Sequence, residues 1–354
     1  MDRPGHEIRL LKEGYWDHTA VVEMPDGSVR VRKQAKSDDP DKIWGVESLR
    51  REIHFLQRHA QDTTRVFPPL LEFWDRADES GNPQVGYEIP FFTHHRDVGS
   101  FAREAQLEQN TIDDFQEKLA EALLMRVHHP VTDSPPLSRH LKQTVHEALL
   151  GLTHDPLMIP LVEANEITLN GRPALGPRAA WDKIVNETEH LASLDAAPTV
   201  QLHGDFFLEN ILWAELPPPA HIPQLILIDP VSVAGVVTGP AVFDLVKYES
   251  YATGELLGLR SEWVDVSGFD ESGHSNEFHY TINLNEPGLK PFRDRNWHGV
   301  FHQRFVDHHG PINRRHYQLI DGYFSVAMAL NTSGKQRKAR LLKAVAEFAD
   351  VLGQ

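Results

Sequence analysis

The chain of 354 residues contains no cysteine. Disulfide bonds, thiolate zinc sites and cysteine nucleophiles are therefore excluded together. The chain also has no apolar run of the roughly 18 to 20 residues that a membrane span requires, and residues 1–7 are polar and lack the apolar core of a signal peptide. These absences predict a cytoplasmic protein that does not contact a membrane.

Positive charge is scarce. The chain has 35 Lys and Arg residues against 51 Asp and Glu residues, which gives a formal net charge of −16. Such a chain binds nucleic acid and anionic membranes poorly. A negative cleft would concentrate a cationic small molecule, but the needs of solubility alone explain many acidic surfaces. We therefore expect a small-molecule acceptor, with a cationic one among the candidates, and no nucleic acid partner. The oligomeric state is not predicted.

Histidine is abundant, but it does not follow a metal-binding pattern. Several of the 21 histidines form adjacent pairs, at His94-His95, His128-His129 and His308-His309. Neighbours in sequence do not share a helix face, and the chain has no His-Glu-x-x-His sequence. No structural metal site is therefore expected.

The most informative segment is His-x-Asp-x4-Asn, formed by His203, Asp205 and Asn210 and followed by a second carboxylate at Asp229. Short apolar runs at 200–202, 211–213 and 225–228 predict strands around it. Phosphoryl transfer needs one carboxylate to orient the attacking hydroxyl, and oxygen ligands for the Mg²⁺ on the nucleotide phosphates. Asp205 suits the first task, and Asn210 with Asp229 suits the second. The alternative is a hairpin whose polar turn holds these residues by chance.

This pattern resembles the aminoglycoside phosphotransferase family of small-molecule kinases, which is related to choline kinases and distantly to protein kinases. The resemblance implies that Asp205 is the catalytic base, that Asn210 and Asp229 bind metal, and that His203 supports the backbone of the loop. It also implies that Asp244, in Val242-Phe243-Asp244-Leu245, braces the catalytic loop. An ordinary helix N-cap is the alternative for Asp244.

The N-terminal part predicts an antiparallel meander over residues 8–35, with a loop at 13–19 that could cover phosphates. Strand alternation places Val29, Val31 and Lys33 on one face. In this order of elements Lys33 is expected to contact the nucleotide phosphates. Taken alone, Lys33 would be interpreted as a surface lysine near a strand end.

Residues 43–60 predict a helix, because Leu49, Ile53 and Leu56 form an apolar stripe. A kinase needs a glutamate here to pair with the phosphate-binding lysine. Its position relative to the stripe, as in family members, favours Glu52 over Glu47. A solvated helix charge is the alternative for either one.

Residues 85–92 predict a strand that leads into the connection between two lobes. By resemblance to family hinges, backbone groups around Glu88, Ile89 and Phe91 would hydrogen-bond a purine. Pro90 has no N–H, so a donor has to come from its neighbours. This hinge does not distinguish ATP from GTP.

A second segment imitates the kinase loop. His95-Arg96-Asp97 spells the protein-kinase catalytic triplet, but the asparagine that should follow five residues after the aspartate is replaced by Ala102. We therefore interpret the triplet as a loop at the start of a helical region.

The remainder of the chain is mostly helical in pattern. Helices are expected at 112–128, 138–153, 179–194, 314–332 and 336–352. Glu249 and Glu255 are candidate contacts for a cationic acceptor, with a solvated helix face as the alternative. The region 261–300, which includes Asp270 and Glu271, is interpreted as a lid or an insertion.

The expected fold class is α+β, a two-lobed protein-kinase-like fold. Its small antiparallel-sheet lobe and hinge would span residues 1–92, and its larger, mostly helical lobe residues 93–354. The expected function is Mg²⁺-dependent transfer of the γ-phosphoryl of ATP or GTP to a hydroxyl of a small molecule. An antibiotic of the aminoglycoside or nucleoside type, with resistance as the outcome, is the first acceptor hypothesis.

Two alternatives stay open. One is a metabolic kinase for a sugar, a nucleoside or an amino alcohol. The other is a catalytically inactive kinase fold that serves as a binding module, although a dead member often loses one of the functional residues that are intact here. A protein kinase is disfavoured, because the metal position lacks Asp-Phe-Gly and no segment ends in Ala-Pro-Glu.

Overall fold

The structure is a computed structural model that describes residues 5–14, 16–36, 43–60, 66–104, 106–219, 222–231, 235–269 and 276–354. The chain divides into two compact units. Unit 1 comprises residues 1–104, 125–127 and 202–237, and unit 2 comprises residues 105–124, 128–201 and 238–354. The expected domain boundary between residues 92 and 93 stays a prediction.

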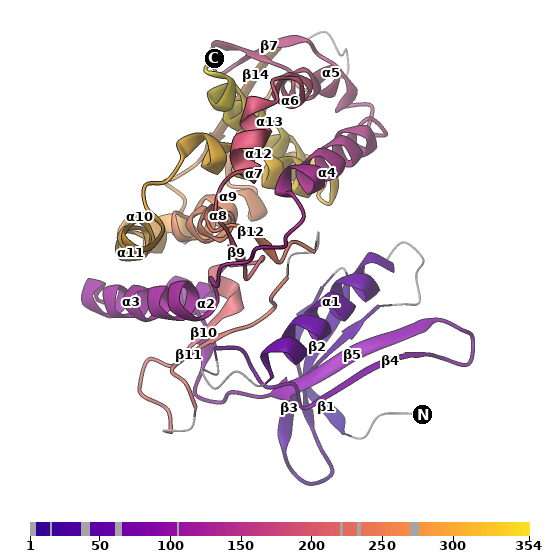
Figure 1. Ribbon diagram of the computed structural model, residues 1–354, viewed down its shortest axis with the longest axis vertical. Coiled ribbons are helices and arrows are strands. Elements are labelled where there is room, and N and C mark those ends of the chain that lie inside the picture. Colours follow the sequence, from indigo (N-terminus) through magenta and orange to yellow (C-terminus); the bar gives the residue numbers. More distant parts are fainter. Residues whose placement is uncertain are drawn as a thin grey trace. The chain divides into compact units, whose positions relative to one another are not determined.

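An antiparallel sheet of five strands forms most of unit 1 (Figure 1). The strands lie in the order β1 (His6–Glu13), β2 (Asp17–Glu23), β3 (Val29–Ala35), β5 (Pro83–Pro90) and β4 (Glu72–Ala77). The meander predicted for residues 8–35 is therefore present. The turn between β2 and β3 is stabilised by Asp26, whose carboxylate accepts a hydrogen bond of 2.9 Å from the Ser28 backbone N–H.

Helix α1 (Ile43–His59) packs against β3 and β5 of this sheet, and Figure 1 shows it lying along the strands. Its apolar side chains recur at helical spacing and are buried: Val46, Leu49, Ile53 and Leu56. The periodicity of the sequence thus fixes which face of α1 meets the sheet. That face also carries Glu52, which is 4% exposed.

A second, three-stranded sheet of unit 1 has the order β11 (Leu225–Leu227), β10 (Ile211–Trp213) and β6 (Arg96–Asp97). The sequence predicted a loop for the His95-Arg96-Asp97 triplet, but Arg96 and Asp97 form a short strand. Asp97 precedes α2 (Val98–Glu104), and its carboxylate accepts a hydrogen bond of 2.7 Å from the Ser100 N–H. This is the role of a helix cap.

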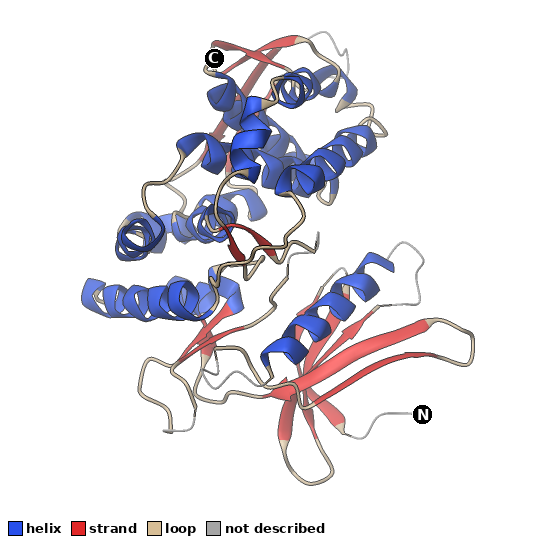
Figure 2. Cartoon of the chain, viewed as in Figure 1, coloured by secondary structure: helices blue, strands red, loops and turns tan. Residues whose placement is uncertain are grey.

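Unit 2 is mostly helical (Figure 2). Its longest helices are α3 (Gln109–Arg126, which ends in unit 1), α4 (Leu137–Leu152), α12 (Arg314–Leu330) and α13 (Gly334–Leu352), and α12 packs along α13. The shorter helices are α5 (Ile159–Val162), α6 (Pro177–Asn186), α7 (Glu189–Asp195), α8 (Val242–Ala252), α9 (Glu255–Arg260), α10 (Lys290–Arg293) and α11 (Gly299–His309). The single helix expected at 179–194 is thus two helices, α6 and α7. In the described residues no helix is both long enough and apolar enough to cross a membrane.

Unit 2 also contains strands that the sequence did not predict. A four-stranded sheet has the order β13 (Val264–Ser267), β14 (Glu277–Ile282), β7 (Glu166–Leu169) and β8 (Arg172–Leu175), with β14 and β7 parallel. A strand pair, β9 (Thr199–Gln201) with β12 (Thr238–Pro240), flanks the candidate catalytic segment in sequence. Of these two, β9 corresponds to the strand expected at 200–202, and β12 was not expected. The region 261–300 thus contributes two strands to this sheet, while Asp270 and Glu271 lie outside the described residues.

Gly86 allows a close approach of three strands that the candidate site needs. It lies in β5 opposite Trp74 of β4 and Gln34 of β3. A Cβ at this position would overlap the Trp74 ring and lie 2.7 Å from the Lys33 carbonyl oxygen.

Gly86→Ala is therefore expected to destabilise the protein by about 1–3 kcal/mol, because the added methyl group overpacks the sheet. Urea unfolding followed by circular dichroism measures this. Gln34→Ala, on the strand opposite, is the matched control, and it should change stability by less than about 0.5 kcal/mol. Equal effects of the two substitutions would contradict the interpretation of Gly86.

Candidate active site

The loop that begins at His203 is a tight turn in unit 1. Gly204 has φ +85°, a left-handed conformation that a side chain would strain. The Asp205 N–H then points back to His203 Nδ1 at 3.3 Å, and the Phe207 N–H donates to the Asp205 carbonyl at 3.0 Å. His203 is fully buried, and its ring lies between those of Phe67 and Phe206. These contacts are what a residue that supports the loop would make, so the role expected for His203 stays a prediction with a geometric basis.

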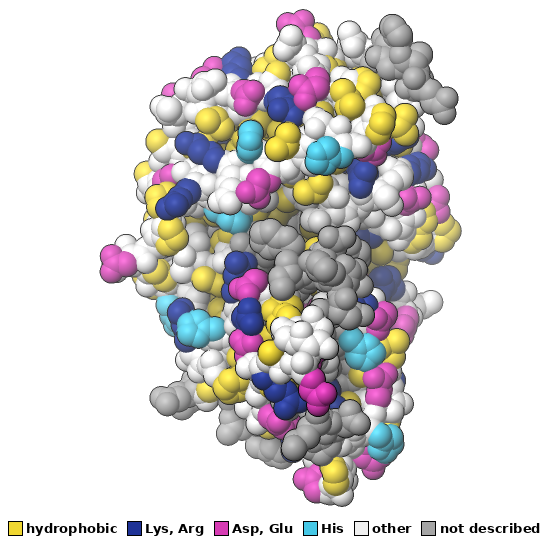
Figure 3. Space-filling model, turned by 90° about the vertical axis from the view of Figure 1, so that its right-hand side faces the viewer, with side chains coloured by type: hydrophobic (Ala, Val, Ile, Leu, Met, Phe, Trp, Pro, Cys, Tyr) yellow, Lys and Arg dark blue, Asp and Glu magenta, His cyan; other side chains and the backbone are white. Residues whose placement is uncertain are grey.

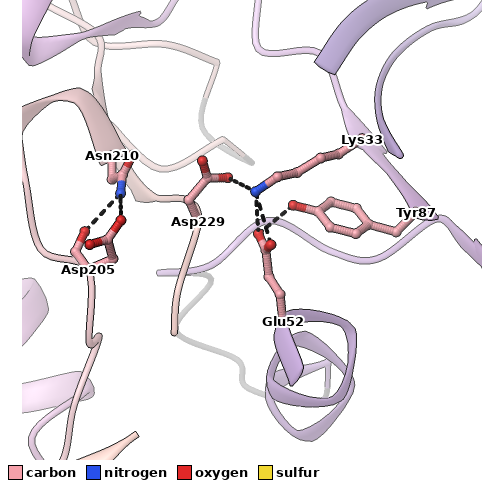
Figure 4. A network of polar contacts seen from close by, with 6 residues as sticks. All are labelled: Lys33, Glu52, Tyr87, Asp205, Asn210 and Asp229. Carbon is pink, nitrogen blue, oxygen red and sulfur yellow. Dashed lines mark hydrogen bonds and ion pairs between the residues drawn. The ribbon is translucent and has the colours of Figure 1, made fainter. Parts of the chain in front are cut away.

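Asn210 ties the end of the loop to Asp205 (Figure 4). Its Nδ2 donates to the Asp205 backbone carbonyl at 2.8 Å and to Asp205 Oδ2 at 3.1 Å. Both bonds use the amide nitrogen, which leaves the amide oxygen as the potential metal ligand. Asn210 is 8% exposed and lies at the end of the 3₁₀ turn η2 (Leu208–Asn210).

Asp229 follows β11 in a strained backbone conformation. Its φ is +52°, in the left-handed region that costs energy for any residue with a side chain. Two backbone hydrogen bonds bracket it: the Ile228 N–H donates to the Asn210 carbonyl at 2.9 Å, and the Val231 N–H donates to the His203 carbonyl at 2.7 Å. Hydrogen bonds therefore join the segment that carries Asp229 to those that carry His203 and Asn210. These bonds hold the Asp229 backbone in its strained conformation.

Lys33 connects the sheet to this loop region. Its Nζ lies 2.9 Å from Glu52 Oε2, 3.3 Å from Glu52 Oε1 and 3.0 Å from Asp229 Oδ1. Figure 4 shows the ammonium between the two carboxylates. Lys33 and Glu52 are 6% and 4% exposed, and the Asp229 side chain is 24% exposed. The Lys33–Glu52 pair that the sequence predicted therefore exists, and Asp229 shares it.

Burial disfavours the charged forms of Lys33, Glu52 and Asp229, and the attraction between the ammonium and the carboxylates favours them. Burial alone would lower the pKa of Lys33, but Asp229 and Glu52 outweigh it and hold that pKa well above its usual value. Burial would raise the pKa of Asp229, but the Lys33 ammonium lowers it overall. Burial raises the pKa of Glu52 to about 7, against the attraction of Lys33. The site thus has a charged lysine and an ionised Asp229.

The donor set fits a magnesium ion, which prefers oxygen ligands. Asn210 offers an amide oxygen, and Asp229 offers a carboxylate whose lowered pKa keeps it ionised. Within the described part of the chain, no cluster of three or more His, Asp or Glu side chains could hold a metal by itself. A magnesium ion here would therefore need further oxygen ligands from nucleotide phosphates or water.

The hinge residues lie at the end of β5 and just beyond it. Glu88 is fully buried: Arg30 donates to its Oε2 at 2.9 Å, and Arg32 Nη2 donates to its Oε1 at 2.7 Å. Its carbonyl accepts a hydrogen bond from the Leu71 N–H at 2.8 Å. Ile89 pairs with Val31, and the Phe91 ring lies under the Arg9 guanidinium. The Glu88 side chain is thus committed to the sheet, and purine contacts by these backbones stay a prediction.

Asp244 lies in unit 2 and is fully buried in the first turn of α8. Its Oδ2 lies 3.1 Å from His128 Nε2. The residue that precedes α8 is Ala241, so Asp244 is not the N-cap residue. A bracing role for Asp244 stays a prediction.

Both candidate acceptor carboxylates have partners within unit 2. Glu249 Oε1 lies 2.6 Å from His302 Nδ1. Glu255 Oε1 lies 2.6 Å from Lys343 Nζ, which also contacts Asp321 at 2.7 Å. Neither carboxylate is therefore an uncommitted surface charge, and contact with an acceptor stays a prediction for both. On the face that Figure 3 draws, acidic side chains of the described residues alternate with basic ones and form no large field of one sign.

Sequence reasoning missed Tyr87. Its hydroxyl donates to Glu52 Oε1 at 2.5 Å, and the residue is 2% exposed. A tyrosine in the middle of a buried strand usually needs a partner for its hydroxyl. Together with strand alternation, that rule could have directed attention to this position.

Comparisons with known proteins are informative about the fold. No protein-family model matches the chain, and no curated protein matches it in sequence. A crystal structure from Thermobifida fusca YX-ER1, of a protein with the provisional name fructosamine-3-kinase, aligns with 99% of this chain and 94% of that chain, with a TM-score of 0.53 and 15% identity. The chain has a two-lobed kinase-like fold.

Two other solved structures are similar at lower TM-scores. A glucosamine kinase in complex with glucosamine, ADP and inorganic phosphate has a TM-score of 0.42 at 12% identity, and it covers 99% of this chain and 94% of that chain. The GDP complex of aminoglycoside 2′-phosphotransferase-IIIa has a TM-score of 0.48 at 15% identity, with the same coverages of 99% and 94%. The kinase-like fold confirms the fold class expected from the sequence, and it confirms the resemblance to small-molecule kinases at the level of the fold.

Replacing Lys33 tests whether its ammonium compensates the charges of Glu52 and Asp229. In the wild-type protein, Asp229 has a lowered pKa, so its stabilising contribution is present above the usual carboxyl pKa and is lost as the pH falls through the folded-state value. Glu52 has a pKa raised to about 7, so it already favours folding somewhat more at about pH 5 than at about pH 7. In Lys33→Met, burial acts on Asp229 and Glu52 without a compensating cation, so both pKa values rise and folding takes up protons. The variant should therefore gain stability as the pH falls from about 7 to about 5.

We expect Lys33→Met to be about 3 kcal/mol less stable than the wild type at about pH 7, with a smaller deficit at about pH 5. Urea unfolding at the two pH values measures the difference. Lys142→Met, at an exposed position of α4, is the control and should leave stability nearly unchanged at both. A deficit that is the same at both pH values would show that Lys33 does not balance these carboxylates.

Proposed function

We propose that the chain is a Mg²⁺-dependent phosphotransferase that moves the γ-phosphoryl group of ATP or GTP to a hydroxyl of a small molecule. The observation that carries the proposal is the grouping of two polar sets within unit 1. Lys33, Glu52 and Asp229 form one set, and Asp205 with Asn210 forms the other. The kinase-like fold supports it independently.

Asp205 is the proposed base. The acceptor hydroxyl oxygen forms a bond to the γ-phosphorus, the bond from that phosphorus to the bridging oxygen of the β-phosphate breaks, and the nucleoside diphosphate leaves with that electron pair. Asp205 takes the hydroxyl proton. Asn210 fixes one oxygen of its carboxylate at 3.1 Å, which orients the carboxylate before the acceptor arrives.

Lys33 is the proposed phosphate contact, positioned by Glu52. Asn210 and Asp229 would hold the metal through oxygen atoms. A bound magnesium ion neutralises charge on the phosphates and on the leaving group. Because Asp229 now contacts Lys33 at 3.0 Å, binding of the nucleotide would divide these partners, with Asp229 turning to the metal and Lys33 to the phosphates.

The acceptor is proposed at the level of class. An antibiotic of the aminoglycoside or nucleoside type, with resistance as the consequence, is the first hypothesis. A metabolic sugar derivative is the second, and it is favoured by the fructosamine-3-kinase name of the similar Thermobifida fusca protein. Both classes include hydroxylated compounds that carry amines.

Mass spectrometry of a pooled reaction tests the function. The mixture contains the purified protein, Mg²⁺, ATP with GTP, and a panel of aminoglycosides, nucleoside antibiotics, sugars, sugar amines and amino alcohols. We expect one compound, or one chemical class, to gain the mass of a phosphoryl group. Nucleotide binding without any product would favour the binding-module alternative, and absence of nucleotide binding would contradict the proposal.

Two aspartates give a matched pair of variants: Asp205 of the His-x-Asp-x4-Asn segment and Asp97 of the His95-Arg96-Asp97 triplet. Asp205→Asn should lower kcat by about 10²–10⁴-fold, because it removes the base, while Mg·ATP still binds. Asp97→Asn should keep wild-type kcat, because an asparagine can cap α2 as an aspartate does. Steady-state kinetics and calorimetric nucleotide binding measure both. Normal turnover by Asp205→Asn would remove this residue from the mechanism.

A further inference from the structure

Tyr87 is a further partner of the Lys33–Glu52 pair, besides Asp229. It pairs with Lys33 across β5 and β3, so both side chains lie on the same face of the sheet. Its hydroxyl reaches Glu52 Oε1 at 2.5 Å, the same oxygen that lies 3.3 Å from Lys33 Nζ. Figure 4 shows the tyrosine ring entering the site beside the lysine. One carboxylate oxygen is thus held mainly by the tyrosine and the other, at 2.9 Å, by the lysine.

Toward the Glu52 carboxylate the hydroxyl acts as the donor. Burial and the neighbouring Glu52 carboxylate raise the pKa of Tyr87 well above its usual value, so the group stays protonated. A hydroxyl that donates to a carboxylate makes a short, charge-assisted hydrogen bond. Phenylalanine would fill the same space without it.

Lys33 has two competing carboxylates. It contacts Glu52 at 2.9 Å and Asp229 at 3.0 Å, which are nearly equal distances. A nucleotide that draws the ammonium toward its phosphates weakens both contacts. At Glu52 the Tyr87 bond persists when the lysine turns, because it does not involve Lys33. At Asp229 the described structure gives no comparable side-chain donor besides Lys33.

We propose that Tyr87 is a positioning residue: it fixes Glu52, and through Glu52 it keeps the Lys33 ammonium available to nucleotide phosphates instead of paired with Asp229. This inference rests on the proposed nucleotide-binding role of the site. It makes the hydroxyl, and not only the ring, a determinant of affinity for the metal–nucleotide complex. The acceptor does not enter the argument.

Calorimetric titration with Mg·ATP and Mg·GTP tests the inference in four proteins: wild type, Tyr87→Phe, Glu52→Gln and the double variant. Tyr87→Phe should weaken nucleotide binding about tenfold, the usual consequence of losing one hydrogen bond to a charged group. In the Glu52→Gln background the same substitution should change binding less than twofold, because its effect passes through Glu52. A tyrosine that only packs the core would give equal effects in both backgrounds.

The matched control is Tyr323→Phe in unit 2. Tyr323 is also buried, at 1% exposed, and its hydroxyl lies 2.9 Å from His140 Nε2. Its loss should lower the melting temperature without changing the dissociation constant for Mg·ATP. Where an acceptor is known, Tyr87→Phe should also raise KM for the nucleotide while KM for the acceptor changes less than twofold.

The outcomes separate this inference from the proposed function. Tenfold weaker binding that disappears in the Glu52→Gln background supports the inference even if no acceptor is ever phosphorylated. Unchanged affinity in Tyr87→Phe, or the same loss in both backgrounds, overturns it while leaving phosphotransfer intact. A wild-type protein that binds neither nucleotide overturns both.

Discussion

The candidate site depends on the position of one buried ammonium between two carboxylates. Lys33 comes from β3, Glu52 from α1 and Asp229 from the end of β11, so the contact joins the five-stranded sheet, its helix and the loop region within unit 1. A buried charge without a partner is costly, and removing one member of such a group leaves the others uncompensated. Electrostatics therefore requires that these three elements stay together, and the same ammonium is the one proposed to contact the nucleotide phosphates.

The loop side of the site depends on backbone geometry instead. Gly204 and Asp229 both have left-handed φ values, and the hydrogen bonds from Ile228 to Asn210 and from Val231 to His203 keep the connected segments in place. Strain of this kind persists only where surrounding contacts over-determine it, and it is concentrated at functional sites. The backbones that carry Asp205, Asn210 and Asp229 are thus held in place before any ligand arrives, which would lower the entropic cost of assembling the proposed reactive complex.

The sequence could predict the parts of this arrangement that follow local rules. Strand alternation placed Lys33 on one face of its strand, and the apolar stripe predicted the helix α1, because each rule involves neighbours along the chain. The choice of Glu52 over Glu47 also used the resemblance to family members. Tyr87 was missed because its role depends on the register between β3 and β5, which no local pattern specifies. The pairing of β14 with β7 could not be predicted for a related reason, because about a hundred residues of sequence separate the two strands. The hairpin of β7 and β8 is different: Asn170-Gly171 at its turn is a local signal that the sequence analysis overlooked.

The candidate acceptor carboxylates, Glu249 and Glu255, show that a carboxylate with a partner inside the protein is less available to a ligand. The net charge of −16 suggested exposed acidic groups for a cationic acceptor, but Glu249 is paired with His302 and Glu255 with Lys343. Lys343 is 5% exposed and contacts three carboxylates, so an acceptor amine that took over Glu255 would remove one of the three partners of a buried ammonium. The Glu249 side chain is 10% exposed, and its partner His302 is 43% exposed and can turn to solvent. An acceptor amine at Glu249 would therefore displace an exposed partner, whereas one at Glu255 would displace a buried ammonium.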